Sequence, residues 1–325
     1  MHPSVEQIFQ NTRTVSTAAA LGTAAIASGL WLAGLSGSAT WQVWLAVIAL
    51  AVGIPHGAMD HIVTVPDMKP WRMTVFITAY LAVVGLAVAA LLVWNVLGFA
   101  IVVVMSAVHF GIGDAAFLRT LAEARQTNTR APWWVYAVPA GAVPVVVPLT
   151  TNQANDALTY VNPVLTDWHQ GFGPIALWLS LGAGAIAVVW LIAAGQSRDA
   201  LDILALGALS LAAPPLVAFA VYFGFWHAQR HTARLVLEIP PAIDRAAKSS
   251  PRAGFLRAVL PGVPALVGTM VVTVGLTLWT GGDISVDYLW IALVIIWALT
   301  VPHMALTWRL DREALAAAPP AETLR

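Results

Sequence analysis

The sequence contains no cysteine among its 325 residues. Disulfides, iron–sulfur clusters and cysteine-ligated zinc are therefore excluded. Charge is also scarce, because only 10% of the residues are Asp, Glu, Lys or Arg, against about 25% in an ordinary soluble domain. The sequence has neither a glycine-rich nucleotide loop nor a basic stripe with interleaved aromatics, so neither a nucleotide nor a nucleic acid is expected as a partner.

Apolar residues make up the bulk of the chain. They account for 59% of it, and the mean hydropathy is +0.78. Long uncharged runs of about 20 residues are the pattern of transmembrane helices. No stretch has the composition of a soluble domain or a linker. The sequence therefore predicts an all-α polytopic membrane helix bundle, formed as a single integral membrane domain over residues 1–325 with membrane lipid around it.

The apolar runs predict about ten transmembrane helices, with eight as the lower bound. The predicted spans cover residues 15–35, 41–55, 73–94, 96–109, 132–149, 172–194, 258–279 and 288–308, with two short helices between 200 and 230. The two short helices are separated at Pro214 and Pro215, because proline removes a backbone donor. A polar lead-in at 1–14 and a flexible tail at 309–325 complete the chain.

The distribution of basic residues predicts the orientation of these spans. Lys and Arg are enriched in cytoplasmic loops of membrane proteins. With ten spans, all 16 Lys and Arg residues fall in, or at the border of, segments on one side, and the loops 36–40, 150–171 and 281–287 contain none. We therefore expect both termini to be cytoplasmic and the protein to be a multi-pass protein of the cell membrane.

Histidines gather at one predicted depth. His227 and His231 are four residues apart, so they share a helix face. With this topology His56, His109 and His303 lie at or near the cytoplasmic ends of three other spans. An ionisable side chain in a membrane is costly and indicates a functional site. A shared metal is the simplest cause, and neutral imidazoles suit iron, copper, nickel or zinc without choosing among them.

Two carboxylates and another histidine accompany this layer. Asp60 and Asp114 are placed to accept the second ring N–H of ligand histidines, although both could simply be residues at a span boundary. His61 follows His56 by five residues and cannot easily share its face, which favours a supporting position or solvent. A lone residue such as His303 is more often packed than ligating. No carboxylate pair or nucleophile is present, so no catalytic group beyond the metal ligands is expected.

Four ordered motifs in the region 41–308 resemble the signature motifs of one enzyme family. They are Gly53-Ile-Pro-His-Gly-Ala-Met-Asp60, His109-Phe-Gly-Ile-Gly-Asp114, Tyr222-Phe-Gly-Phe-Trp-His-Ala-Gln-Arg-His231 and Val301-Pro-His-Met304. The family is Brp/Blh, the membrane β-carotene 15,15'-dioxygenases. The resemblance implies cleavage of the central double bond of β-carotene with O₂, two molecules of all-trans-retinal as product, and Fe(II) as the cofactor.

The resemblance also assigns residues. The iron ligands it implies are His56, His109, His227 and His231, with His303 outside the ligand set. We expect the substrate, a hydrocarbon dissolved in the bilayer, to lie among apolar walls. The predicted lining residues are Phe110, Phe223, Phe225, Trp226 and Trp297. The product implies a functional link to a retinal-binding rhodopsin.

Other functions are compatible with parts of this pattern. One is a different histidine-ligated iron oxygenase that acts on another carotenoid or a lipid, including a diiron hydroxylase, although that class uses about eight histidines in repeated boxes. A metal or proton transporter predicts polar residues through the outer halves of the spans, where this sequence has almost none. A non-catalytic rhodopsin chaperone predicts that the histidines are dispensable.

Overall fold

The computed structural model describes residues 2–35, 40–65, 69–127, 130–281 and 284–316, and within these residues it contains helices and no β-strand. The all-α class is therefore confirmed. The longest helices are α1 (Pro3–Leu32), α2 (Thr40–Gly57), α4 (Pro70–Val93), α5 (Asn95–Ala124), α8 (Gly173–Ala193), α14 (Val263–Trp279) and α15 (Ile284–Ala316).

Seven helical segments of the described residues are long and apolar enough to cross a membrane. An eighth is present if α6 (Trp133–Leu149) and α7 (Ala154–Val161), which meet at an 82° bend, form one span. The expected count of ten is thus not confirmed. Of the two remaining segments, α9 (Ser197–Ala212) has only 16 residues. The other is divided into α10 (Pro215–Ala220), η2 (Val221–His227) and α11 (Ala228–Glu238).

The boundary at the two consecutive prolines is confirmed, since α9 ends before Pro214 and α10 begins at Pro215. Helix α1 already begins at Pro3, so residues 3–14 of the predicted polar lead-in are helical. Its polar residues are tolerated inside the helix because Arg13 is buried and paired with carboxylates of α9. The tail prediction also shifts, since α15 continues to Ala316. Residues 317–325 lie outside the described part, and the side on which the termini lie stays a prediction.

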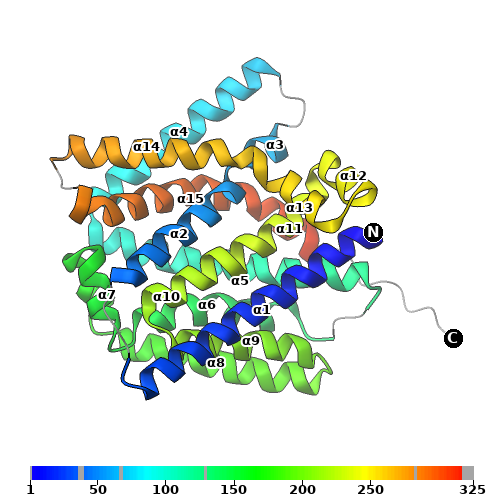
Figure 1. The fold of residues 1–325 in the computed structure, drawn as a ribbon, viewed down its shortest axis with the longest axis horizontal. Helices are drawn as coiled ribbons and strands as arrows, with labels where there is room; N and C mark the ends of the chain where they lie inside the picture. The colour runs from blue at the N-terminus through cyan, green and yellow to red at the C-terminus, as the bar shows by residue number, and fades with distance from the viewer. Residues whose placement is uncertain (1, 36–39, 66–68, 128–129, 282–283, 317–325) are drawn as a thin grey trace.

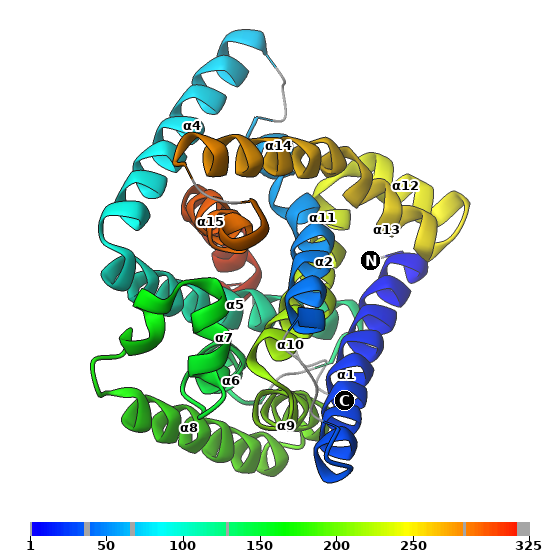
Figure 2. The same ribbon diagram turned by 60° about the vertical axis from the view of Figure 1, so that its left-hand side comes forward.

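Figure 2 views α15 almost end-on, with α2 running beside it near the middle of the molecule. Helices α14 and α4 cover one side of this pair, α8 and α9 lie on the opposite side, and α1 runs along a third. Figure 1 shows α2, α11, α5 and α15 as neighbouring layers. Large apolar side chains of α4, α8 and α14 are exposed on the outside, as expected of surfaces that face lipid.

Short helices connect the long ones. They are α3 (Asp60–Thr64), η1 (Pro163–Asp167), α12 (Pro240–Lys248), α13 (Pro251–Val259) and η3 (Leu260–Gly262). Glycines allow α5 and α6 to approach closely. A Cβ on Gly111 would collide with the carbonyl of Ala137, and a Cβ on Gly141 with the carbonyl of Ala107. Small residues at such crossings let membrane helices pack tightly. This close packing holds the part of α5 that carries His109 against α6.

Candidate metal centre

Five imidazole rings from five helical elements meet in the interior. His56 comes from the last turn of α2, His109 from α5, His227 from the end of η2, His231 from α11 and His303 from α15. All five side chains are buried. The predicted gathering of histidines is therefore present, and His303 belongs to it.

The rings are in mutual contact. The centroid of His56 lies 5.4 Å from that of His227, 5.2 Å from that of His231 and 5.5 Å from that of His303. His109 lies 5.2 Å from His227 and 5.4 Å from His303. His231 lies 5.3 Å from His303 and 6.1 Å from His227. Every ring therefore has at least two histidine neighbours. We call these five residues the histidine cluster.

Nitrogen atoms in the cluster lack partners. The Nε2 atoms of His109, His227, His231 and His303 are buried without a hydrogen bond in the described residues. A buried polar atom without a partner is costly and needs an explanation. Four such atoms on touching rings have the chemistry of ligands that converge on one ion.

Two hydrogen bonds favour the tautomer that a metal needs. The Nδ1 of His56 contacts the backbone carbonyl of Gly53. The Nδ1 of His303 lies 2.8 Å from Oδ1 of Asp60. Because the carbonyl and the carboxylate only accept, a neutral ring places its proton on Nδ1 and keeps the Nε2 lone pair free.

The imidazole nitrogens of the cluster are suitable donors for a metal ion, and the distances between the rings can be compared with those in a metal site. Nitrogens that share an ion lie about 2.1 Å from it, which puts neighbouring ring centroids on the order of 5 Å apart. The observed separations of 5.2 to 6.1 Å lie at or slightly above this value. In the described part of the chain no three His, Asp or Glu side chains stand close enough to hold an ion. The free Nε2 atoms therefore supply donors of suitable chemistry, in an arrangement that does not by itself define the position of an ion.

Asp60 supports the cluster through His303. Its Oδ1 accepts from that ring, and its Oδ2 accepts from the hydroxyl of Tyr80 at 3.1 Å. The same hydroxyl lies 3.2 Å from the carbonyl of Leu299. Asp60 was predicted to accept from a ligand histidine, and its histidine partner in the structure is His303, which the sequence analysis placed outside the ligand set. Tyr80 was not predicted, because a tyrosine within an apolar span has no distinguishing sequence pattern.

Asp114 has different partners from those predicted. Its Oδ2 accepts from the indole N–H of Trp226 at 2.6 Å and lies 3.9 Å from Arg230, while its Oδ1 has no hydrogen-bond partner in the described residues. It therefore does not bind a ligand histidine. Because Trp226 and Arg230 flank His227 in sequence, Asp114 instead holds the helix that carries the two neighbouring histidines.

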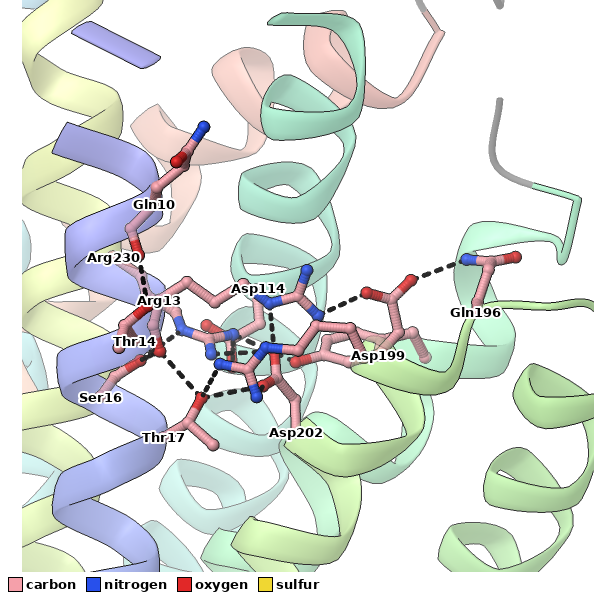
Figure 3. A network of polar contacts seen from close by, with 12 residues as sticks. Gln10, Arg13, Thr14, Ser16, Thr17, Asp114, Gln196, Asp199, Asp202 and Arg230 are labelled. Atoms are coloured by element: carbon pink, nitrogen blue, oxygen red, sulfur yellow. Dashed lines mark hydrogen bonds and ion pairs between the residues drawn. The ribbon is translucent and has the colours of Figure 1, made fainter. Parts of the chain in front are cut away.

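Arg230 is the centre of a buried polar network, drawn in Figure 3. Its guanidinium lies 3.1 Å from Oδ2 of Asp202 in α9 and donates to Ser16 of α1 and Tyr136 of α6. It also stacks on the ring of Trp226, 3.8 Å from the centroid. The residue next to His231 is thus tied to three other helices.

The network extends to the first helix. Arg13 donates to Asp202 at 2.9 Å and to Asp199 at 2.5 Å, and the hydroxyl of Thr17 donates to Asp202 at 2.9 Å. Asp202 is fully buried. Because one carboxylate serves both Arg13 and Arg230, it connects α1 and α9 to the helix of His231.

The backbone before His227 departs from the α-helix. Residues Val221–His227 form a π-helix, and the side-chain amide of Gln229 donates to the carbonyl of Gly224. Such segments occur at functional sites because they re-aim side chains. Gly224 packs against Ala49, where a Cβ would be crowded. The sequence had predicted only a regular helix with an i, i+4 pair.

Two cavities adjoin the histidine cluster. The first, of about 340 Å³, is lined by four of its members, His56, His109, His227 and His303. The second, of about 130 Å³, is apolar and lies among α5, α6, α7, α10, η2 and α15. The two share four lining residues, which are Phe110, Phe223, Ile296 and Thr300.

The predicted lining residues divide into two groups. Phe110 and Phe223 line both cavities, and Trp297 lines the second. Phe225 and Trp226 are among the lining residues of neither cavity. Phe225 is 37% exposed, and Trp226 is fully buried against Asp114 and Arg230. Both lie on other faces of the π-helix from Phe223.

His61 also lines the first cavity. Its Nδ1 lies 3.0 Å from the carbonyl of Ala58, and within the described residues no ring contact joins it to the histidine cluster. The geometry therefore agrees with a position outside the ligand set.

Known proteins resemble this chain over most of its length. The family described as beta-carotene 15,15'-dioxygenase matches residues 45–311. A Halobacterium salinarum protein named probable beta-carotene 15,15'-dioxygenase Blh is 29% identical over 300 residues, which cover 82% of this chain and 84% of that protein. A second protein of that organism, named probable beta-carotene 15,15'-dioxygenase Brp, is 27% identical and covers 81% of each.

A third relative, from an uncultured marine bacterium, is named beta-carotene 15,15'-dioxygenase. It is 27% identical over 202 residues, which cover 58% of this chain and 67% of that protein. No solved structure matches the chain.

Proposed function

Since the chain belongs to the β-carotene 15,15'-dioxygenase family, we propose that it cleaves the central 15,15' double bond of β-carotene with O₂ and releases two molecules of all-trans-retinal. The protein is an enzyme of the oxidoreductase class, and the names of its relatives support carotenoid cleavage. The observation that carries the proposal is the histidine cluster, which forms part of the wall of an apolar cavity inside a bundle of membrane helices.

The proposed cofactor is Fe(II). Its proposed ligands are His56, His109, His227 and His231, supported by the buried Nε2 atoms of the last three. When bound, ferrous iron supplies the electrons and the open positions that activate O₂ beside the polyene. The ligands are all neutral, and no carboxylate needs to be displaced.

The cavity walls position the polyene and exclude water. Phe110 and Phe223 stand between the two cavities, and the ring centroid of Phe110 lies 4.2 Å from that of His227. A polyene held against these rings has its reacting bond next to the histidine cluster. The apolar walls exclude water, which protects the reaction from hydrolytic side steps. Each carbon of the broken C=C bond takes one oxygen atom of O₂, so no general acid, base or external reductant is required.

The membrane supplies the substrate and takes up the product. We propose a multi-pass position in the cell membrane with both termini cytoplasmic, because of the predicted distribution of Lys and Arg. β-Carotene is insoluble in water, so a site within the bilayer takes it laterally from lipid. The retinal released there is available to a retinal-binding rhodopsin, the functional partner that the family implies.

We extend the proposed ligand environment to His303. Its Nε2 is buried and free, its ring touches three other rings of the cluster, and Asp60 accepts its Nδ1 proton. This is the arrangement of a metal-facing histidine with a carboxylate behind it. His303 would therefore be a fifth imidazole that faces the proposed iron, and Asp60 would be the residue that positions it.

Replacing Asp60 by alanine is expected to weaken Fe(II) binding by about 10- to 100-fold, because the carboxylate that orients His303 is lost. The measurement is titration of purified apo-protein with Fe(II). Tyr80→Phe is the matched control, since it removes the other hydrogen bond to Asp60 and leaves the bond to His303. Equal affinity of Asp60→Ala and the wild type would remove Asp60 from this role.

Expression in a β-carotene-producing host tests the proposed function. The cells are expected to lose colour and accumulate retinal, measured by chromatography. Purified protein is expected to lose activity when iron is chelated and to regain it with Fe(II) but not with Zn²⁺. Bleaching without retinal would mean another cleavage position, and activity that survives complete removal of iron would contradict the cofactor.

A further inference from the structure

The second cavity runs along the same helices that carry the histidines. On α5 its lining residues include Phe99, Val103, Ser106 and Phe110, and the last of these is adjacent to His109. These positions recur at helical spacing, so they form one face. At about 1.5 Å per residue, the stretch from Phe99 to Phe110 extends about 16 Å.

Helix α15 gives the same length independently. Leu289, Leu293, Trp297 and Thr300 line the cavity, and His303 follows one turn later. The stretch from Leu289 to Thr300 again extends about 16 Å. The cavity therefore extends from the histidine cluster between two helices that carry histidines, as a slot whose lining residues cover about 16 Å of each helix.

Side chains bound the far end of the slot. Leu158 and Val161 of α7 line it there, and α7 turns away from α6 by 82°. Phe99 packs on the ring of Trp168 with centroids 5.6 Å apart, and the indole of Trp168 donates to the carbonyl of Leu149 at 3.4 Å. The segment after α6, predicted only as an outer loop, therefore forms the end wall.

The first cavity leads the other way, toward lipid. Ile77 and Leu81 of α4 line it, and these side chains are 45% and 59% exposed. Ala265 and Thr269 of α14 line it as well. A hydrocarbon can therefore enter between α4 and α14, pass the histidine cluster at Phe110 and Phe223, and continue into the second cavity.

We propose that the second cavity is a length gauge that receives one half of a linear polyene and thereby selects the bond that is cut. This inference rests on the proposed function. From the central bond of β-carotene to its terminal ring there are about nine bonds, or about 11 Å at about 1.2 Å per bond of extended chain. With the ring added, the half-molecule matches the slot. A chain seated against Leu158 and Val161 has its central bond beside the histidine cluster.

The gauge acts on position and leaves the chemistry unchanged. Whichever C=C bond lies beside the cluster is broken, and each of its carbons receives one atom of the same O₂. Central seating gives two equal aldehydes, and any shift along the slot gives two unequal ones. The product pair therefore records the depth to which the polyene enters.

Val103→Phe tests the gauge by filling the slot midway. The polyene then enters less deeply, so unequal aldehydes become the main products and the share of retinal falls by about tenfold or more. Val104→Phe is the matched control, because Val104 is the next residue of α5 and is 63% exposed on the outer face. It is expected to produce retinal only. Products are separated by chromatography and identified by mass.

Leu158→Ala supplies the opposite change in case Val103→Phe does not fold. A deeper slot admits more of the chain, so unequal aldehydes again appear, with the longer one formed from the half inside the slot. Retinal as the only product of every active variant would overturn the inference and leave the proposed function intact. A wild-type protein that forms no aldehyde from β-carotene would instead contradict the proposed function itself.

Discussion

Replacing His227 by alanine is expected to abolish retinal formation, with a loss of well over about 100-fold. His227 lies among three other histidines of the cluster. Its ring contacts those of His56, His109 and His231, and its Nε2 is buried without a partner. Removing it takes away a proposed ligand and opens a gap beside Phe110. Retinal in a β-carotene-producing host and iron per chain in the purified protein are both expected to fall.

The two readouts separate a catalytic role from a structural one. His2→Ala is the control, because His2 is an exposed N-cap of α1, whereas all five histidines of the cluster are buried. It is expected to keep full iron content and activity. Substantial retinal formation by His227→Ala would remove His227 from the ligand set and would favour a non-catalytic role of the protein beside a rhodopsin.

Asp202→Ala is expected to have the largest effect on stability. Asp202 is fully buried and is the shared partner of Arg13 and Arg230. Its removal takes from the buried Arg230 its nearest counter-ion and from Arg13 one of its two carboxylate partners. Removing one partner of a buried ion pair costs about 3–5 kcal/mol. That is a large part of the 5–15 kcal/mol that typically separates folded from unfolded protein. We expect a marked loss of folded, monodisperse protein in detergent and a lower thermal midpoint.

Asp199→Ala is the matched control for that experiment. Asp199 lies on the same helix at the edge of the network, where it pairs with Arg13 and accepts from the side-chain amide of Gln196. It is expected to lower the midpoint much less, because Arg13 keeps Asp202. An unchanged midpoint in Asp202→Ala would contradict the view that this carboxylate connects α1 and α9 to the helix of His231.

The gathering of histidines could be predicted because two independent patterns agree on it. The spacing of His227 and His231 places them on one helix face, and the distribution of basic residues aligns the spans that carry His56, His109 and His303. Both patterns depend only on helix geometry and on the preference of Lys and Arg for one side of a membrane. The resemblance to a family then supplied the metal and the substrate, which spacing alone left open.

The partners of the polar residues could not be predicted, because they depend on how helices pack. Nothing in the sequence pairs Asp60 with His303, since 243 positions separate them. Arg13 looked like a basic residue of a polar lead-in, yet α9 offers two carboxylates that allow it to be buried. The π-helix that ends at His227 could not be predicted either, because its residues are also typical of an ordinary apolar α-helix.

The expected count of ten spans is not confirmed, because seven helical segments of the described residues, or eight with α6 and α7 together, are long and apolar enough to cross a membrane. Apolar composition does not set the length of a helix, and α9 has only 16 residues. The proline break between α9 and α10 and the shortness of the two helices were predicted from the sequence, whereas the division of the second one into α10, η2 and α11 was not.

X-ray absorption at the iron edge of the purified, active protein tests the central claim most directly. We predict one iron per chain, with histidine nitrogens at about 2.1 Å as its only protein ligands. A second metal at about 3.5–4 Å, the spacing of two-metal sites, would contradict a single-iron cluster and favour a diiron oxygenase. Active protein that contains no iron would contradict the account altogether.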